Sequence, residues 1–234
     1  MTDIQSLFDN SKRIVFLTGA GISTPSGIPD YRSKNGLYTN DKTSKPAEYY
    51  LSHECLVKEP AVFYDYVISN LDYPDAQPNV IHEKQAALTR AARATVVTQN
   101  IDNLYEKAHT ENLIEFHGNL GRIYCQKCGV KTDLATYRHS MIHENCGGIL
   151  RPDVVLYGEG INEQVVMDSV TSLQKADLIV VVGTSMRVYP FAGLLDYRNP
   201  AAQVLVINQE KLNLPEPFIM EQGNAVDIFK KLRV

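Results

Sequence analysis

Five short apolar runs, rich in valine, isoleucine and leucine, recur along this chain, and segments with helical periodicity separate them. They cover residues 13–19, 94–100, 112–118, 177–185 and 203–208. Continuous apolar strands are typical of a parallel sheet that is buried on both faces. Alternation of such strands with helices predicts an α/β fold built on a doubly wound parallel sheet.

The segment before the fourth run predicts one of the intervening helices. Val166, Val170 and Leu173 recur at helical spacing, so they lie along one stripe of a helix. Asn162 stands where its side chain can cap the start of that helix.

Two segments interrupt the alternation of strand and helix. Residues 32–78 are rich in tyrosine and polar side chains, and residues 122–150 carry three of the four cysteines. We therefore expect a large sheet domain made of residues 1–31, 79–121 and 151–234, into which these two segments are inserted.

Composition and charge exclude several classes of function. The 234 residues are 44% hydrophobic and 21% charged, with a formal net charge of −4 at pH 7, so no basic surplus favours a nucleic-acid partner. Apolar runs such as LIVVV at residues 178–182 fall far short of the roughly 20 residues of a membrane helix, and no membrane partner is expected. The N-terminal residues lack the long apolar core of a secretion signal, so we expect a cytoplasmic protein.

Three of the four cysteines form a candidate metal site. Cys125 and Cys128 have C-x-x-C spacing, and Cys146 follows after a short interval. In a reducing compartment such a cluster favours metal binding over disulfides, and a closed tetrahedral zinc site needs a fourth ligand. Cys55 stands alone and is expected to be a small buried apolar residue.

Polar clusters follow the apolar runs at the positions where doubly wound sheets bind ligands. Small residues after the first run either let backbone N–H groups approach a pyrophosphate or simply form a tight connection. A histidine beside amide and carboxylate groups suggests a base that titrates near neutral pH. The clusters comprise Gly19, Ala20 and Gly21; Gln99, Asn100 and Asp102; His117; Gly183, Thr184 and Ser185; and Asn208.

The motifs GAGIS, GIPDYR, TQNID, FHG, C-x-x-C, LRPDVVLYGE and GTSMRVYP occur in an order and spacing similar to those of sirtuins. From about residue 10 onward the chain resembles a compact bacterial-type sirtuin. The resemblance implies a Rossmann-like large domain, a cofactor loop and helical insertion at residues 32–78, and a small zinc-binding domain at residues 122–150. It also implies an NAD-dependent protein lysine deacylase that transfers the acyl group to ADP-ribose and releases nicotinamide.

The resemblance further implies roles for individual residues. His117 is expected to act as general base on the ribose hydroxyls, Asn100 to order the ribose or a water, and Asp102 to accept a hydrogen bond from the nicotinamide carboxamide. Acyl-lysine proteins or peptides are the expected partners, bound along Val154, Val155 and Tyr157 by a protein that we expect to be a monomer. The implied NAD-binding residues are Gly19, Ala20, Gly21, Thr24, Tyr31, Arg32, Gln99, Ile101, Asp102, Gly183, Thr184, Ser185, Asn208 and Val226.

The fourth zinc ligand follows from the same resemblance. Sirtuin zinc sites pair one C-x-x-C with a second, and Cys146 aligns with the last ligand, so His143 takes the place three residues before it. Cys₃His is an accepted structural zinc set. His139 and Cys55 are the rival candidates, and a site that binds no metal is the remaining alternative.

Two positions depart from the family pattern. PDYR replaces the usual PDFR, and Tyr31 keeps the aromatic ring there. Family members that favour acidic acyl groups carry Tyr-x-x-Arg in the first insertion, but residues 64–67 read YDYV, so a succinyl carboxylate would lack its bidentate partner. Two alternative functions stay open: an ADP-ribosyltransferase, and a zinc-containing binding module that senses NAD.

Overall fold

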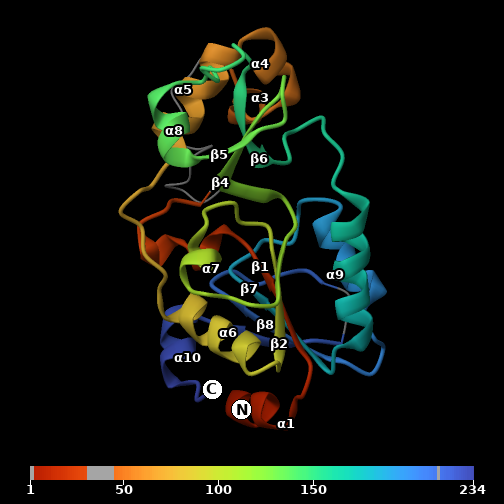
Figure 1. Cartoon of the computed structure of the whole chain (residues 1–234). Helices are drawn as coiled ribbons and strands as arrows, with labels where there is room; N and C mark the ends of the chain where they lie inside the picture. Colours follow the sequence, from red (N-terminus) through yellow and green to blue (C-terminus); the bar gives the residue numbers. More distant parts are fainter. Residues whose placement is uncertain (1–2, 31–44, 215–216) are drawn as a thin grey trace.

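The computed structural model describes residues 3–30, 45–214 and 217–234, and it contains a large parallel sheet and a small antiparallel sheet (Figure 1). The large sheet has the strand order β3-β2-β1-β7-β8-β9, and every neighbouring pair is parallel. The expected Rossmann-like α/β fold is therefore confirmed. Its strands are β1 (Ile14–Thr18), β2 (Ala94–Thr98), β3 (Leu113–Glu115), β7 (Leu178–Val182), β8 (Gln203–Asn208) and β9 (Ile219–Gln222).

Helices cover both faces of the large sheet because its central strands are apolar on both sides. All residues of β1 and β7 are buried. One apolar cluster joins one face to α1 (Ile4–Asn10), α6 (Val80–Arg90) and α10 (Ala225–Lys231). Another joins the opposite face to α9 (Glu163–Lys175) and the 3₁₀ helix η3 (Phe191–Tyr197). The side chain of Asn162 accepts from the backbone N–H of Gln164 at 2.8 Å, so the predicted cap of α9 is confirmed.

The apolar run at residues 112–118 forms two strands instead of one. β3 ends at Glu115, and β4 (Gly118–Cys125) begins three residues later in the other sheet. Gly118 turns the chain with φ +81°, and a Cβ there would lie 2.0 Å from the carbonyl oxygen of Asp153. Only glycine accepts this turn, so His117 lies at the crossing between the two sheets.

The small sheet has the order β5-β4-β6, with β5 at Lys131–Asp133 and β6 at Leu150–Val154. Its apolar face shares one buried cluster with the helices of the first insertion. Figure 1 shows these helices and α8 gathered around the small sheet, at the end of the molecule away from both termini. The helices are α3 (Ala47–Tyr50), α4 (His53–Lys58), α5 (Pro60–Asn70) and α8 (Leu134–His139). The domain boundaries expected from the sequence stay a prediction.

The two ends of the chain are bonded to each other. The backbone N–H of Arg233 donates to Oε1 of Gln5 at 2.8 Å, and Nε2 of Gln5 donates to the carbonyl oxygen of Arg233 at 3.1 Å. Helix α1 and the C-terminal end of the chain lie at the end of the molecule opposite the small sheet (Figure 1). Within the described ranges, no helix combines the length and apolar character needed to cross a membrane.

Candidate functional site

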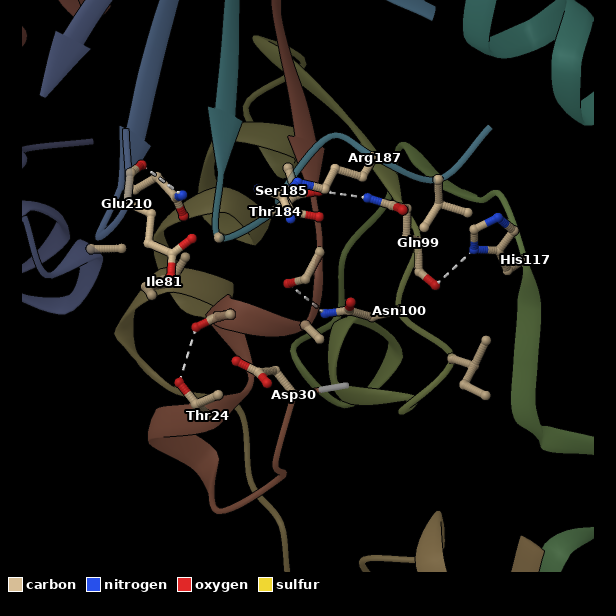
Figure 2. A pocket seen from close by; sticks show the side chains of 18 of the residues that line it. Thr24, Asp30, Ile81, Gln99, Asn100, His117, Thr184, Ser185, Arg187 and Glu210 are labelled. Carbon is tan, nitrogen blue, oxygen red and sulfur yellow. Dashed lines mark hydrogen bonds between the residues drawn. The ribbon is translucent and has the colours of Figure 1, made fainter. Parts of the chain in front are cut away.

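A cavity of about 1230 Å³ opens at the carboxyl ends of the central strands (Figure 2). The loops after β1, β2 and β7 form one wall, together with the end of β8. Residues 154–161, which run from the last residue of β6, form the opposite wall. The predicted site residues that line it are Gly19, Ala20, Gly21, Thr24, Gln99, Asn100, Ile101, His117, Val154, Val155, Tyr157, Gly183, Thr184, Ser185, Asn208 and Val226.

Among the described residues, one predicted NAD-binding residue does not line this cavity. Asp102 lies behind the lining, in contact with Ser23. Tyr31 and Arg32 lie outside the described residues.

Glycines bring the loops after β1 and β7 into backbone contact. The N–H of Gly21, in the 3₁₀ helix η1 (Ala20–Ile22), donates to the carbonyl oxygen of Gly183 at 2.8 Å. A Cβ on Gly21 would lie 2.8 Å from that same oxygen, and a Cβ on Gly19 would lie 2.7 Å from Cβ of Thr184. The small residues of the GAGIS motif therefore let the two loops form one continuous wall.

Amide side chains after β2 connect these loops. Nε2 of Gln99 donates to Oγ1 of Thr184 at 2.8 Å. Nδ2 of Asn100 donates to the carbonyl oxygen of Gly19 at 3.2 Å and to Oγ of Ser23 at 3.1 Å. The contacts hold both amides in fixed orientations at the edge of the cavity (Figure 2).

Asp102 is bound from two directions. Oγ of Ser23 donates to Oδ2 of Asp102 at 2.6 Å, and the backbone N–H of Leu104 donates to Oδ1 at 3.0 Å. Burial raises the pKa of Asp102 above its usual value, although both hydrogen bonds oppose that change. Ser23 thus links Asp102 to Asn100, a connection that the sequence did not reveal.

The imidazole of His117 presents one nitrogen to the backbone and leaves the other for the cavity. Nδ1 lies 3.2 Å from the carbonyl oxygen of Gln99, which can only accept a hydrogen bond, so Nδ1 carries the proton in the neutral ring. Phe116 and Phe191 pack around the ring. Burial lowers the pKa of His117, an effect that the bond to Gln99 opposes. A neutral imidazole with an available Nε2 is a competent proton acceptor at neutral pH.

Several cavity residues were not singled out from the sequence. Asp30, Arg187 and Glu210 line the cavity and are labelled in Figure 2. Asp30 and Arg187 lie inside the motifs GIPDYR and GTSMRVYP, and Glu210 is two residues beyond Asn208. Their place next to predicted residues was the signal that could have identified them.

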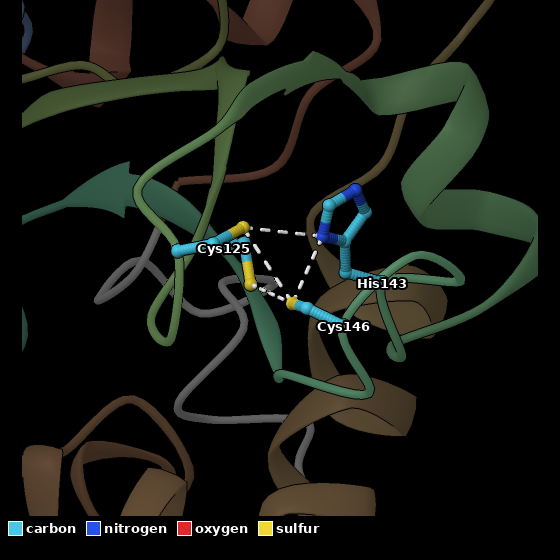
Figure 3. A group of neighbouring side chains, drawn as sticks. Cys125, His143 and Cys146 are labelled. Carbon is cyan, nitrogen blue, oxygen red and sulfur yellow. Dashed lines mark hydrogen bonds between the residues drawn. The ribbon is translucent and has the colours of Figure 1, made fainter.

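The candidate zinc ligands lie at the end of β4 and in the turns beside it, and they include the histidine chosen from the sequence (Figure 3). One ligand atom from each of Cys125, Cys128, His143 and Cys146 lies within 4.8 Å of the others. Nδ1 of His143 is 3.3 Å from Sγ of Cys128 and 3.2 Å from Sγ of Cys146. Tetrahedral zinc with bonds of about 2.0–2.3 Å spaces its ligands by roughly 3.5–3.8 Å, so the four groups fit this metal. Among the described residues, the cluster includes neither His139 nor Cys55.

The surroundings of Cys125 suit a metal-bound thiolate. Burial raises the pKa of this thiol, but backbone N–H groups of Cys128 and Lys127 outweigh that effect and lower it to about 6. A Cβ on Gly148 would lie 2.5 Å from Sγ of Cys125, so glycine keeps this side of the cluster open for the ligands. Cys55 is fully buried in the neighbouring apolar cluster, as its isolated position predicts.

Comparison with known proteins agrees with the motifs. The Sir2 family model matches residues 19–190. The chain is 58% identical to the NAD-dependent protein deacetylase of Lactiplantibacillus plantarum over 100% of this chain and 99% of that protein. It is 51% identical to the NAD-dependent protein deacetylase of Listeria monocytogenes, over 99% of this chain and 100% of the other.

Solved structures extend the comparison to bound molecules. One is a Sir2 protein with a deacetylated p53 peptide and 3′-O-acetyl ADP-ribose, with TM-score 0.85 and 28% identity over 96% of this chain and 94% of that one. Another is a Sir2 protein bound to a propionylated peptide, with TM-score 0.82 and 27% identity over 97% and 94% of the two chains.

Proposed function

Because the chain belongs to the Sir2 family and is an NAD-dependent protein deacetylase, we propose that NAD and an acylated lysine meet in the cavity beside His117. The cavity is lined by the glycine-containing turn after β1 and by polar side chains at the end of β2. The relatives that carry acetyl-ADP-ribose and acylated peptides support this assignment.

The loops after β1 and β7 suit the pyrophosphate of NAD. Ala20, Gly21, Thr184 and Ser185 line the cavity along the continuous wall that these two loops form. Asn208 and Val226 line a part of the same cavity that is suited to the adenosine, and Gln99 and Ile101 a part suited to the nicotinamide. In this assignment Asn100 orders the ribose. The contact of Asp102 with the carboxamide stays a prediction, because Asp102 lies behind the lining and is bonded to Ser23 and Leu104.

The geometry of His117 carries the proposal. Its Nδ1–H is engaged by Gln99, so Nε2 is left to remove a proton from a ribose hydroxyl. Breaking the bond between nicotinamide and ribose lets the acyl oxygen of the lysine substrate attach to the ribose. A base at the hydroxyls then promotes transfer of the acyl group to ADP-ribose.

The wall formed by residues 154–161 suits the acyl-lysine peptide. Val154, Val155 and Tyr157 line the cavity on this side, and Tyr157 keeps 42% of its surface exposed. An extended peptide can add to such a segment through its main chain, so selectivity for the surrounding sequence should be loose. Acetyl and longer neutral acyl groups are the proposed substrates, since the succinyl-binding arginine of other family members has no counterpart at residues 64–67.

The remaining assignments are structural and cellular. Cys125, Cys128, His143 and Cys146 are proposed to hold one zinc that stabilises the small sheet and takes no part in the chemistry. The monomeric state and the cytoplasmic location expected from the sequence stay predictions.

A product assay tests the proposal. Purified protein is incubated with NAD and a panel of acetyl-, propionyl-, butyryl- and succinyl-lysine peptides, and the products are identified by mass spectrometry. We expect free lysine, nicotinamide and O-acyl-ADP-ribose from the neutral acyl peptides, and no reaction without NAD. Transfer of ADP-ribose to protein without O-acyl-ADP-ribose would favour the alternative ADP-ribosyltransferase, and binding of NAD without turnover would favour the sensing module.

A further inference from the structure

The irregular segment at residues 154–161 is held in place by charged side chains that have no part in the proposed chemistry. We propose that Arg151, Glu159 and His53 form a clamp that positions this segment, and that the clamp sets the affinity for the acyl-lysine peptide. The inference rests on the proposed function, because it takes this wall of the cavity to be the peptide side.

The carboxylate of Glu159 is the centre of the clamp. Oε1 accepts a hydrogen bond from Nη1 of Arg151 at 2.6 Å and lies 3.0 Å from Nδ1 of His53. Oε2 accepts hydrogen bonds from Nη2 of Arg151 at 3.0 Å and from the backbone N–H of Leu156 at 3.0 Å. Four donors therefore use the hydrogen-bonding sites of both oxygens, which only an ionised carboxylate can offer. These bonds outweigh the effect of burial and lower the pKa of Glu159 to about 2.

Arg151 connects Glu159 back to the strand from which the segment departs. It belongs to β6 and keeps only 4% of its surface exposed. Its Nε donates to the carbonyl oxygen of Pro152 at 3.2 Å, and its Nη2 donates to that of Val154 at 2.7 Å. One guanidinium thus bonds both to the start of the segment and to Glu159, so it closes the segment into a fixed turn.

The closed turn is also attached to its neighbours on two sides. The backbone N–H of Val155 donates to the carbonyl oxygen of His117 at 2.9 Å. The backbone N–H of Tyr157 donates to the carbonyl oxygen of Leu51 at 3.0 Å, and that of His53 donates to the carbonyl oxygen of Tyr157 at 2.9 Å. The segment is therefore bonded through its main chain to His117 on one side and to Leu51 and His53 on the other.

The clamp lies apart from the wall assigned to NAD. Within the part of the chain that the structure describes, no hydrogen bond of Arg151, Glu159 or His53 reaches the loops after β1, β2, β7 or β8. Loosening the clamp should therefore weaken peptide binding and leave NAD binding unchanged. Misplaced main-chain groups lose their bonds to the substrate peptide, which raises its KM.

Steady-state kinetics of Glu159→Gln test the clamp. Glutamine keeps the shape of glutamate and one acceptor oxygen. Its NH₂ group, however, is itself a donor, and it would face groups that now donate to the carboxylate of Glu159. We expect the KM for an acetyl-lysine peptide to rise by about tenfold or more, with the KM for NAD within about twofold and kcat at saturating peptide little changed. The matched control is Glu54→Gln. It removes an exposed carboxylate that pairs with Lys58 across one helical turn, and it should change neither KM.

A second variant covers the case in which Glu159→Gln does not fold. His53→Ala removes one exposed contact to the same carboxylate and should raise the peptide KM by about threefold. If Glu159→Gln is unstable, the test rests on His53→Ala, and an unchanged peptide KM in that variant overturns the inference. An equal rise in the KM for NAD would also overturn it, because it would indicate a general loss of structure. A wild type without NAD-dependent deacetylation would instead overturn the proposed function, and the inference with it.

Discussion

The carbonyl oxygen of Gln99 lies 3.2 Å from Nδ1 of His117, and this contact decides which nitrogen of the ring can act as a base. Because a carbonyl only accepts, it selects the tautomer with an unprotonated Nε2. Gln99 itself is bonded to Thr184, so the orientation of the proposed base depends on residues that follow three strands of the large sheet, β2, β3 and β7.

Replacing His117 with alanine should lower the rate of deacetylation by about 100-fold or more, because a general base contributes about that much. The ring is surrounded by Phe116 and Phe191 at the cavity edge, so NAD binding and the fold should be largely kept. Product formation, NAD titration calorimetry and thermal unfolding of the same preparation give the comparison. A variant that retains more than about a tenth of the rate would remove His117 from this role.

The pH profile of deacetylation should extend further into acid than the pKa of free histidine suggests. Burial lowers the pKa of His117, and the base is active only when its ring is neutral. Activity is therefore full above this lowered pKa and lost as pH falls through it. We expect the acid limb of kcat below about pH 6.5, the usual histidine pKa. An acid limb above pH 7 would show that another group limits the reaction.

Asp102→Asn should make the protein more stable and less active. Burial raises the pKa of Asp102, so its charged form is disfavoured in the folded state at pH 7. Asparagine carries no charge, so it removes the free-energy cost of burying the carboxylate, and we expect Tm to rise by a few degrees. We expect the rate of deacetylation to fall by about tenfold. The difference in stability should shrink as pH falls through the raised pKa and the carboxyl becomes neutral. A lower Tm at pH 7 would mean that the bonds from Ser23 and Leu104 outweigh the burial.

Gly21→Ala should weaken NAD binding, because the added Cβ would lie 2.8 Å from the carbonyl oxygen of Gly183 and force two backbones apart. Overpacking of this kind costs about 1–3 kcal/mol of stability, and we expect the NAD Kd to rise by about tenfold or more. Gly193→Ala is the matched control, since its Cβ would meet only the ring of Tyr189 at 3.5 Å. Equal effects of the two substitutions would contradict the close approach of the loops.

Metal analysis should find one zinc per chain in the wild type and in His143→Cys, since thiolate and imidazole both bind zinc in tetrahedral sites. His143→Ala should bind zinc weakly and unfold at a lower temperature, because structural zinc contributes on the order of 10 kcal/mol to folding. His139→Ala is the control and should keep its zinc, since the cluster does not include His139. Full zinc occupancy in His143→Ala would refute the ligand set.

Much of the large sheet could be predicted because its central strands carry their own signal. Every residue of β1 and β7 is buried, and such strands read as continuous apolar runs. The edge strand β9 was missed, since Ile219–Gln222 mixes apolar with polar residues and is only partly buried. Its pairing with β8 is decided by tertiary contact and not by its own pattern.

The strand-end residues of the site could be predicted for the same reason, whereas their supports could not. Ser23 is 79 residues from Asp102 in the sequence, and its place in a glycine-containing turn suggests only local structure. The contact of His53 with Glu159 crosses 106 residues, from the first insertion to the segment that follows β6. Side-chain pairs of this kind depend on how segments that are distant in the sequence pack together. A local pattern of apolar and polar residues therefore does not predict them.

The mutual bonds of Gln5 and Arg233 have a practical consequence for how the protein can be handled. Both ends leave the molecule at one point, on the edge opposite the small sheet (Figure 1). A short linker could therefore join them in a circular permutant without spanning the cavity. For the same reason, a tag that tethers the protein to a solid support through either end should leave the proposed peptide-binding side facing the solution.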